Sequence, residues 1–481
     1  MLQFTISEVA QATAAEVLVE GSNVVTNVAI DSREVTQNSL FVCFAGERVD
    51  GNAYAPAAIE QGASAIALTS DPSFDLVNLA RERGCALLRV QDRDATEFLL
   101  RLAAAWRTRN AHWVVVGVTG SVGKTTTKDM LAAGLGAGGS VHATKGNYNN
   151  LVGVPLTLLS ADANNEYVVC EMGMDHAGEL TKLSAVVRPD LAVITNVGTS
   201  HIGNLGSREA IAKAKAEICS GMRRGDDPDS VVAPIIALTD DNDFASFIEE
   251  GFASVLGISV SRVGYRDNCA VQARDVTLDD EGMPTVTLVF PDDYQLTTTL
   301  DVPGMHVVSD FLLAMDIVWH LGIDRDAAAK AISCMPRTAL RLEVKTAPDR
   351  PRVIDDSYNA SPNSMAGAFD VLCSMTCEGR RIAVIGEIGE LGEDSARLHG
   401  YVGAYAAAKP IDLLAIVGGE GADAIAEAAL TMGFSPDKLE RFADCQAALD
   451  TLRGIFGPDD LVLVKASRFV GLDVFAKGVL A

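Results

Sequence analysis

A glycine-rich turn between an apolar strand and a helix, at residues 113–131, restricts the fold of this chain more than any other feature. The run WVVVGVT at 113–119 is almost entirely apolar, which is typical of a strand buried on both faces of a parallel sheet. The continuation GSVGKTTTKDML predicts a helix, and a helix is the usual connection between parallel strands. The segment therefore predicts an α/β fold built from βαβ units.

Apolar runs of similar length recur along the chain and alternate with helical segments, which indicates further βαβ units. They are NVVTNVAI, SLFVCFAG, SAIALTS and ALLRV near the N-terminus, EYVVCEM and LAVITNV in the middle, and RVIDD, RIAVIGEI, DLLAIVG and DLVLVKA near the C-terminus. The chain has 481 residues, which at roughly 150 residues per domain allows about three domains. We predict three tandem α/β domains at 1–105, 106–336 and 337–481. The central domain should have a parallel P-loop ATPase-type sheet and the last a Rossmann-like sheet.

The central block departs from this pattern in three places. Residues 264–302 alternate apolar and polar side chains, which predicts an antiparallel excursion of the sheet. A pair of helices is expected at about 307–335, before Pro336. The polar stretch RRGDDPDS at 223–230 predicts a solvated loop.

The charge balance excludes some classes of partner. Lys and Arg total 39 against 64 Asp and Glu, so the formal net charge is -25. General binding to nucleic acid or to an anionic membrane needs a positive field, so we expect neither. No apolar run reaches the roughly 18 residues that span a bilayer. The first residues lack the pattern of a signal peptide, and the nine cysteines form no C-x-x-C pair. We expect a cytoplasmic protein with reduced thiols.

The turn after the first central strand has the residues of a phosphate-binding loop. Backbone N–H groups of such a turn, together with a helix N-terminus, bind phosphate oxygens. Lys124 would reach the β- and γ-phosphates, and the Thr125 hydroxyl a magnesium ion. The strict pattern requires glycine at Val118, so this T-G-x-x-G-K-T is a variant. The predicted nucleotide contacts are Thr119, Gly120, Ser121, Val122, Gly123, Lys124, Thr125 and Thr126. The alternative is a glycine-rich turn that binds nothing.

Other polar residues follow the strands of the same predicted sheet. Glu171 ends the run EYVVCE, where a carboxylate would hold magnesium or be an exposed strand-end acid. His201 follows LAVITN and is either a ligand or structural. In AKAKAEI, Lys213 and Lys215 face different sides of a helix, and solvated lysine is the default for both.

These residues lie in motifs that resemble the Mur ligase family. The motifs are TGSVGKTTTK, TKGNYNNLVGVPLTLL, EMGMDHAGEL, TNVGTSHIGNLGS, AKAKAEI, RLEV with DDSYNASPNSM, and GEIGELGEDS. They occur in family order from about residue 117 to 400. The N-terminal block DSREVTQNSLFVCFAGERVDGNAYAPAAIEQGA also resembles the uridine-nucleotide domain of some members.

The resemblance implies an ATP-dependent ligase of peptidoglycan synthesis, and therefore of cell-wall biogenesis, cell shape and cell division. It implies three roles along the chain: uridine-nucleotide binding, ATP binding, and binding of the incoming amino substrate. DDSYNASPNSM favours the member that adds D-alanyl-D-alanine to UDP-N-acetylmuramoyl-tripeptide. ATP and Mg²⁺ are the implied cofactors, and an acyl phosphate is the implied intermediate. We expect a monomer.

The family's functional residues transfer to this chain position by position. Lys124, His201 and Lys215 become the catalytic group, with Lys215 carbamylated and Lys213 left on the surface. Thr125, Glu171, His201 and Lys215 become the metal ligands. His306, Asp310, Arg341 and Asp356 become further nucleotide contacts. The substrate contacts are Ser32, Arg33, Gly46, Arg48, Asp50, Asn147, Asn149, Asn150, Tyr358 and Asn359; a surface turn is the alternative for those near the N-terminus.

The chain departs from the family pattern at the expected adenine contact. The family has an Asn-x-x-Asn pair after a histidine, and PGMHVVSDFLLA places Val307 and Asp310 there. An ionised Asp310 accepts a hydrogen bond and does not donate one. Lys465, Ser467 and Arg468 in VKASR either contact the incoming dipeptide or form a surface strand end.

Two other functions fit the same sequence. One is a related ligase with a different acceptor, such as a folylpolyglutamate synthase. The other is a nucleotide-binding scaffold without turnover, which the substitutions at Val307 and Asp310 suggest.

Overall fold

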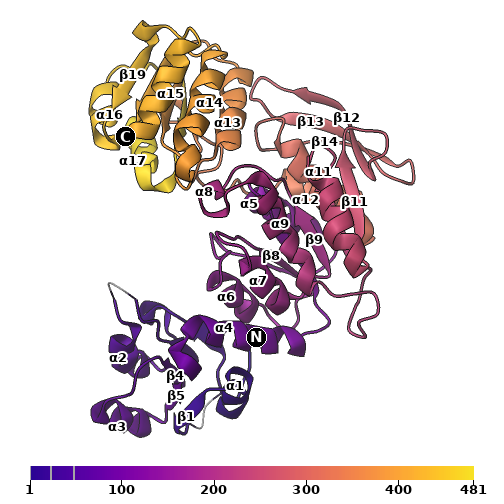
Figure 1. Ribbon diagram of the computed structural model, residues 1–481, viewed down its shortest axis with the longest axis vertical. Helices are drawn as coiled ribbons and strands as arrows, with labels where there is room; N and C mark the ends of the chain where they lie inside the picture. Colours follow the sequence, from indigo (N-terminus) through magenta and orange to yellow (C-terminus); the bar gives the residue numbers. More distant parts are fainter. Residues whose placement is uncertain (1, 22–23, 47–48) are drawn as a thin grey trace.

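A computed structural model describes residues 2–21, 24–46 and 49–481. Within these residues the chain forms three mixed α/β bodies, each around its own sheet, arranged in chain order with the central one between the other two (Figure 1). The predicted fold class is confirmed.

The N-terminal sheet has the strand order β1-β5-β4-β3-β2, with β1 antiparallel to β5 and the other pairs parallel. Its elements are α1 (Ile6–Thr13), β1 (Glu16–Val19), β2 (Asn27–Ala29), β3 (Ser39–Val42), α2 (Ala55–Glu60), β4 (Ala65–Leu68), α3 (Phe74–Arg83), β5 (Ala86–Arg89) and α4 (Ala95–Arg109). The sequence did not single out α1, β1 or α3, which are short or weakly apolar.

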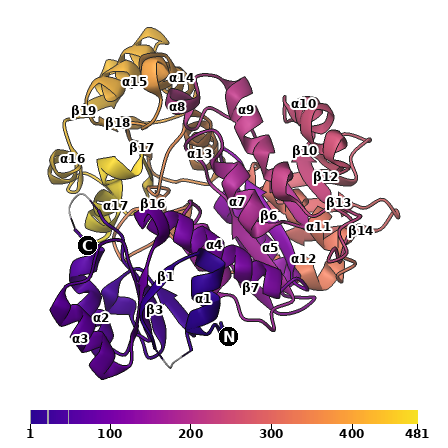
Figure 2. The ribbon, with the colours of Figure 1, turned by 60° about the horizontal axis from the view of Figure 1, so that its bottom comes forward.

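Helix α4 joins the first body to the second. The predicted boundary at residue 105 falls inside this helix. The Trp106 indole donates a hydrogen bond to the carbonyl of Ala161 (3.3 Å), and the buried Arg107 guanidinium donates to the carbonyl of Val187 (2.9 Å). The end of α4 therefore packs on the central body, as Figure 2 shows.

The central sheet has the order β14-β13-β12-β11-β10-β9-β6-β8-β7. It is parallel from β7 to β12 and antiparallel from β12 to β14, which confirms the predicted excursion. Its strands are β6 (Val114–Thr119), β7 (Val141–Ala143), β8 (Tyr167–Glu171), β9 (Leu191–Ile194), β10 (Ile235–Thr239), β11 (Ser259–Gly264), β12 (Val271–Leu278), β13 (Pro284–Val289) and β14 (Gln295–Thr299). Its helices are α5 (Lys124–Leu135), α6 (Gly153–Ser160), α7 (Glu179–Val187), α8 (Ile202–Leu205), α9 (Arg208–Ala216), α10 (Ala245–Ile248), α11 (Val307–His320) and α12 (Arg325–Ser333).

The two faces of this sheet have separate apolar cores. On one face α5, α11 and α12 pack over the strands. The core on the other face continues into both neighbouring bodies. The predicted helix pair is confirmed as α11 and α12. The prediction of a fully solvated loop at 223–230 is wrong at its first residue, because Arg223 is buried and pairs with Asp190 (3.3 Å).

The C-terminal sheet has the order β15-β16-β20-β17-β18-β19 and is parallel except for β15. Its strands are β15 (Glu343–Lys345), β16 (Arg352–Asp355), β17 (Arg381–Gly386), β18 (Leu413–Val417), β19 (Leu439–Phe442) and β20 (Leu461–Lys465). Its helices are α13 (Pro362–Ser374), α14 (Ser395–Ala407), α15 (Glu420–Thr431), α16 (Cys445–Leu452) and α17 (Leu472–Leu480). Among the residues described, no helix is long and apolar enough to cross a membrane.

Candidate active site

The phosphate-binding loop connects β6 to α5 in the middle of the central sheet. Two of its glycines are sterically required: a Cβ at Gly120 would collide with the Thr195 side chain, and one at Gly123 with the Asp310 carboxyl group. Gly123 also has a φ of 86°, a left-handed conformation that favours glycine. The Lys124 ammonium group donates to the carbonyl of Gly120 (2.7 Å) and so folds over the loop. The predicted strand, turn and helix are all present.

The neighbouring strand β9 holds this loop from the side. The Asn196 side chain accepts a hydrogen bond from the backbone N–H of Val122 (3.0 Å), and the Thr195 hydroxyl donates to the carbonyl of Val122 (2.5 Å). Ser121 lies beside the same segment, because its hydroxyl accepts from the N–H of Gly198 (2.9 Å). Thr119 is buried at the end of β6, and Thr126 follows on α5.

Glu171 lies at the carboxyl end of β8, directly beside the loop. Its carboxylate accepts hydrogen bonds from the Thr125 hydroxyl (2.9 Å) and from the Asn149 amide (2.8 Å). The side chain is buried, with 2% of the residue exposed. The interpretation as an exposed strand-end acid is therefore wrong. The structure therefore brings together Thr125, Asn149 and Glu171, which lie far apart in the sequence.

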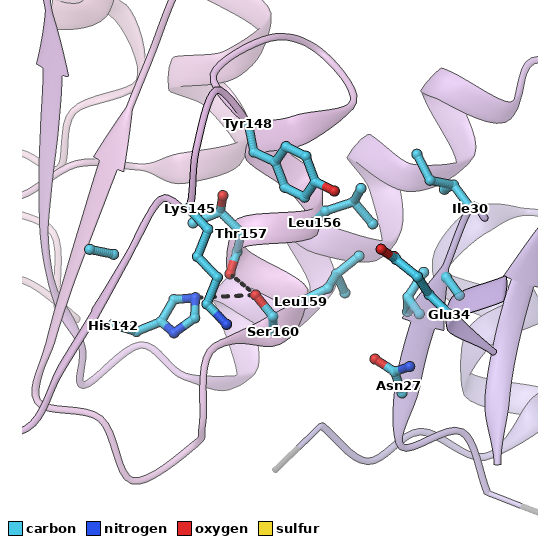
Figure 3. A pocket seen from close by; sticks show the side chains of 13 residues that line it. Asn27, Ile30, Glu34, His142, Lys145, Tyr148, Leu156, Thr157, Leu159 and Ser160 are labelled. Carbon is cyan, nitrogen blue, oxygen red and sulfur yellow. Dashed lines mark hydrogen bonds between the residues drawn. The ribbon is translucent and has the colours of Figure 1, made fainter. Parts of the chain in front are cut away.

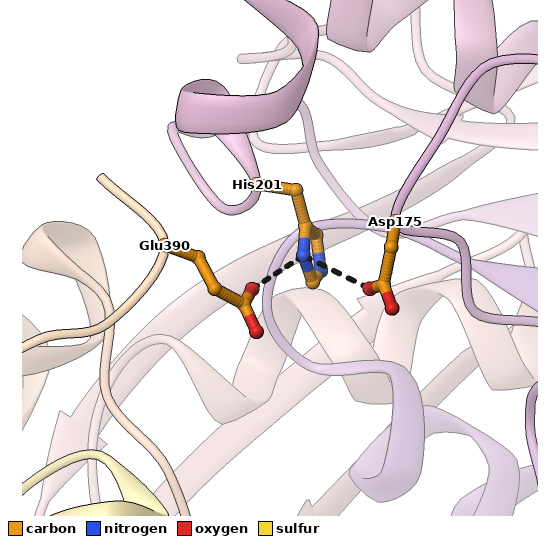
Figure 4. Close-up of side chains that lie close together, drawn as sticks. All are labelled: Asp175, His201 and Glu390. Atoms are coloured by element: carbon orange, nitrogen blue, oxygen red, sulfur yellow. Dashed lines mark ion pairs between the residues drawn. The ribbon is translucent and has the colours of Figure 1, made fainter. Parts of the chain in front are cut away.

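His201 lies between two carboxylates at the boundary with the C-terminal body (Figure 4). Its Nδ1 atom is 2.6 Å from Oε2 of Glu390 and 3.2 Å from Oδ1 of Asp175. His201 has a φ of 62° and Glu390 one of 65°, which is uncommon for residues other than glycine and typical of functional sites. The N–H of Gly203 also donates to the carbonyl of Glu390 (3.0 Å).

Sequence reasoning missed Asp175 and Glu390. Asp175 follows β8, His201 precedes α8, and Glu390 follows β17, so docking of two bodies creates the cluster. No spacing in the sequence signals such a contact.

Lys215 is buried on α9, with 1% of the residue exposed, while Lys213 is exposed as expected. Within the described chain the Lys215 amine makes no hydrogen bond and no ion pair. Burial, and secondarily the charge of Lys124, lowers the pKa of Lys215 well below its usual value. Burial also lowers the pKa of Lys124. The default of a solvated lysine is therefore wrong for Lys215.

Asp310 is buried under the phosphate-binding loop rather than exposed to solvent. Its carboxyl group accepts a hydrogen bond from the Thr127 hydroxyl (3.0 Å). Burial raises the pKa of Asp310 to about 8, although Thr127 and Arg341 oppose the shift. At neutral pH the protonated form predominates, and a carboxylic acid both donates and accepts hydrogen bonds. Asp310 thus retains the hydrogen-bonding pattern of an asparagine.

The C-terminal body contributes an aromatic ring flanked by two cations. The guanidinium of Arg341 lies 4.4 Å from the centre of the Tyr358 ring, and that of Arg468 lies 5.6 Å from it. Arg341 is close enough to Lys124 and Asp310 to affect the pKa of each. Arg341, a predicted nucleotide contact of the C-terminal body, therefore lies near Lys124 and Asp310 of the central body.

Asp356 is paired with a buried lysine. Its carboxylate lies 2.6 Å from the Lys465 ammonium, which also donates to the carbonyl of Asn359 (3.0 Å). His306, at the start of α11, is within electrostatic reach of Asp356 across the boundary between the bodies. Lys465 is 2% exposed, so the alternative of a surface strand end is wrong for it.

Ser32, Arg33 and Asp50, three of the predicted N-terminal substrate contacts, lie in or directly before two short turns. Asp31 caps the turn Ser32–Glu34 and pairs with the exposed Arg33 (2.5 Å). Asp50 caps the turn Gly51–Tyr54, and the N–H of Gly46 donates to the carbonyl of Val49 (3.1 Å). Arg48 lies outside the described residues.

A cavity of about 270 Å³ lies between the N-terminal and central bodies, near the turn Ser32–Glu34 (Figure 3). Asn27, Ile30 and Glu34 line one side, and Lys145 and Tyr148 line the other. The predicted asparagines belong to the same loop as Tyr148. Asn147 is exposed, Asn149 contacts Glu171, and Asn150 accepts hydrogen bonds at the start of α6.

Comparisons with known proteins decide the family. Three family descriptions match in order: "Mur ligase family, catalytic domain" at 24–107, "Mur ligase middle domain" at 118–318, and "Mur ligase, glutamate ligase domain" at 340–468. A UDP-N-acetylmuramoyl-tripeptide–D-alanyl-D-alanine ligase from Bacillus subtilis is 34% identical, and the alignment covers 99% of this chain and 97% of that protein.

The chain belongs to the Mur ligase family.

Other relatives agree over the whole length. The Escherichia coli ligase of the same name is 31% identical over 98% of this chain and 97% of its own. A crystal structure of MurF from Acinetobacter baumannii superposes with a TM-score of 0.86 at 28% identity, covering 99% of both chains. MurF ligase from Thermotoga maritima, in complex with ADP, has a TM-score of 0.76 at 26% identity and covers 94% of this chain and 97% of that one. This Mur ligase therefore has the three-body fold of the solved MurF structures.

Proposed function

We propose that this chain is an ATP-dependent amide ligase that joins D-alanyl-D-alanine to UDP-N-acetylmuramoyl-tripeptide in peptidoglycan precursor synthesis. Whole-length similarity to ligases of that name supports the reaction. The observation that carries it is the contact of Thr125 with Glu171 beside Lys124, because these groups meet where the phosphates of ATP would bind. We further propose that the enzyme is monomeric and acts in the cytoplasm.

The proposed division of labour follows the three bodies. Residues 1–105 would bind the uridine nucleotide, 106–336 ATP, and 337–481 the dipeptide. The turn residues Ser32, Arg33 and Asp50 and the nearby asparagines would contact the substrate. Tyr358 and Asn359 would line the cleft on the C-terminal side, with Arg341 and Asp356 directed toward the nucleotide.

The residues present fit divalent cations. Thr125 and Glu171 offer the hydroxyl and carboxylate oxygens that Mg²⁺ prefers. Ligand atoms of Asp175, His201 and Glu390 lie within 4.8 Å of one another. The buried hydroxyl of Thr199 has no hydrogen-bond partner among the described residues. We propose that Thr125 and Glu171 hold one Mg²⁺ and that His201 and a carbamylated Lys215 hold a second. Bound Mg²⁺ would neutralise phosphate charge and polarise the γ-phosphate.

The chain's own residues then have distinct tasks. The substrate carboxylate is a poor electrophile. Transfer of the γ-phosphoryl group of ATP to one of its oxygens, with release of ADP, gives an acyl phosphate that has a better leaving group. Lys124 and Arg341 would stabilise the negative charge that develops when two anions approach. Docking of the C-terminal body on α8 would exclude water from that intermediate. The amine of D-alanyl-D-alanine then displaces phosphate.

Carbamylation of Lys215 is chemically reasonable at this position. The neutral amine attacks carbon dioxide, an N–C bond forms, and one proton is released to solvent. The lowered pKa of Lys215 favours the neutral amine that this reaction requires. The product replaces a buried neutral amine near Lys124 with an anion that attracts the Lys124 ammonium group.

An isotope experiment tests the mechanism. Tripeptide substrate labelled with ¹⁸O in its terminal carboxylate is incubated with ATP, Mg²⁺ and D-alanyl-D-alanine. An acyl phosphate requires one ¹⁸O atom to appear in the released phosphate. Amide product with unlabelled phosphate would exclude that intermediate, whereas no amide product would exclude the proposed function.

A further inference from the structure

Two adjacent residues of α5 connect the Glu171 side of the site to the linker between the central and C-terminal bodies. Lys128 and Asp129 form an ion pair, and their side chains are 7% and 26% exposed. Burying an ammonium group is costly unless it is paired and hydrogen-bonded. The Lys128 ammonium meets this need by also donating to the carbonyl of Thr144 (3.1 Å). The phosphate chemistry proposed above uses neither residue.

On one side the contacts lead to Glu171. Thr144 follows β7, and its hydroxyl accepts a hydrogen bond from the backbone N–H of Glu171 (3.0 Å). Lys128 therefore holds Thr144 in place, and Thr144 in turn holds the backbone of Glu171. The Glu171 carboxylate in turn contacts Thr125 and Asn149.

On the other side the contacts lead to the C-terminal body. The Asp129 carboxylate accepts a hydrogen bond from the Thr338 hydroxyl (2.6 Å). Thr338 lies in the linker between α12 and β15, three residues before Arg341, whose guanidinium stacks on Tyr358. The linker is therefore in direct contact with Asp129.

We propose that Lys128 and Asp129 are positioning residues that couple the placement of the interdomain linker to the orientation of Glu171. The inference rests on the proposed function, because Glu171 matters through the phosphate chemistry. Linker docking orders Thr338, Asp129, Lys128 and Thr144 in turn, so Glu171 is correctly placed when the C-terminal body is in position. ATP is then activated only when the acceptor-binding body is docked.

The test replaces two members of this path by apolar groups of similar size. Thr338→Val removes one hydroxyl, and Lys128→Met removes the ammonium group. We expect Thr338→Val to lower kcat at least five-fold and Lys128→Met at least ten-fold, with the KM for ATP within two-fold. The double variant should be no slower than Lys128→Met alone, because both changes interrupt the same path. The proposal would be overturned if the two reductions in kcat multiply in the double variant, or if kcat is unchanged in Thr338→Val.

Two controls separate positioning from general damage. Thr338→Ser keeps the hydroxyl and should restore kcat. Thr298→Val removes a comparable hydroxyl, one that contacts Ser333 at the end of α12 (2.9 Å), and should leave kcat unchanged. If Thr298→Val slows the enzyme as much as Thr338→Val, the effect is structural and the proposal fails.

A second readout does not depend on activity. Hydrogen–deuterium exchange of peptides containing Thr144 and Glu171 should be faster in Thr338→Val than in the wild type, without nucleotide or metal. Unchanged exchange there contradicts the coupling. Wild-type protein that makes no amide product would refute the proposed function, whereas active wild type with unaffected variants would refute only this inference.

Discussion

Replacing Asp310 by asparagine should flatten the dependence of stability on pH. Asp310 is 6% exposed, and its carboxyl group faces the Thr127 hydroxyl, the backbone at Gly123 and the charge of Arg341. Burial raises its pKa from 3.8 to about 8. Because the folded-state pKa is raised, the folded state holds a proton that the unfolded state releases between these values. Stability is therefore highest below the unfolded-state pKa and falls as the pH rises toward about 8.

The magnitude follows from proton linkage. Each pH unit between the two pKa values costs about 1.4 kcal/mol of unfolding free energy. Between pH 5 and pH 7 the wild type should lose roughly 3 kcal/mol relative to Asp310→Asn. The variant should keep the Thr127 contact, since an amide oxygen also accepts a hydrogen bond.

Urea denaturation of both proteins at pH 5, 6, 7 and 8 measures this difference. The exposed Asp437→Asn substitution controls for the loss of one carboxylate. We expect the gap between wild type and Asp310→Asn to widen up to pH 7 and to level off above pH 8. If the unfolding free energies of wild type and Asp310→Asn change with pH in parallel, the assignment of a protonated Asp310 is refuted.

Three further variants test other parts of the site. Gly123→Ala should reduce ATP affinity at least ten-fold in equilibrium titration, because the added Cβ meets the Asp310 carboxyl group. Gly433→Ala is the control: Gly433 has a φ of 92° and no neighbouring atom that a Cβ would meet, so this variant has the backbone strain alone and should bind ATP normally. Lys215→Ala should abolish ligation, and wild type in carbonate-free buffer should regain activity on addition of bicarbonate; an active Lys215→Ala would exclude the carbamate. Arg107→Met should destabilise the fold by about 3–5 kcal/mol in denaturant, because it leaves buried backbone carbonyls without a partner and removes one of the two buried arginines that pair with Asp190; a loss no larger than that of exposed Arg81→Met would contradict this.

The sequence predicts well what local patterns determine. Strands β6, β8, β9 and β20 lie in apolar runs of the sequence. The glycines of the turn from Gly120 to Gly123, between an apolar strand and a helix, are typical of a phosphate-binding loop. The strand order places Glu171 and His201 at one edge because parallel strands share their carboxyl ends.

The remaining features depend on packing between distant segments. Glu390 reaches His201 only because two bodies dock, and Lys215 is buried only because α9 turns that face inward. The protonated state of Asp310 likewise arises from its place under the loop rather than from its neighbours in sequence. Helix α4 crosses the predicted boundary because its last turn binds the central body.

The most direct test of the central claim is phosphate release from ATP in the presence of UDP-N-acetylmuramoyl-tripeptide. The reaction is run with D-alanyl-D-alanine, with single amino acids, with glutamate and without an acceptor. We expect phosphate release with the dipeptide alone, and a product heavier than the tripeptide substrate by the dipeptide minus one water. Release with glutamate instead would contradict the acceptor, and ATP binding without any release would indicate a scaffold rather than an enzyme.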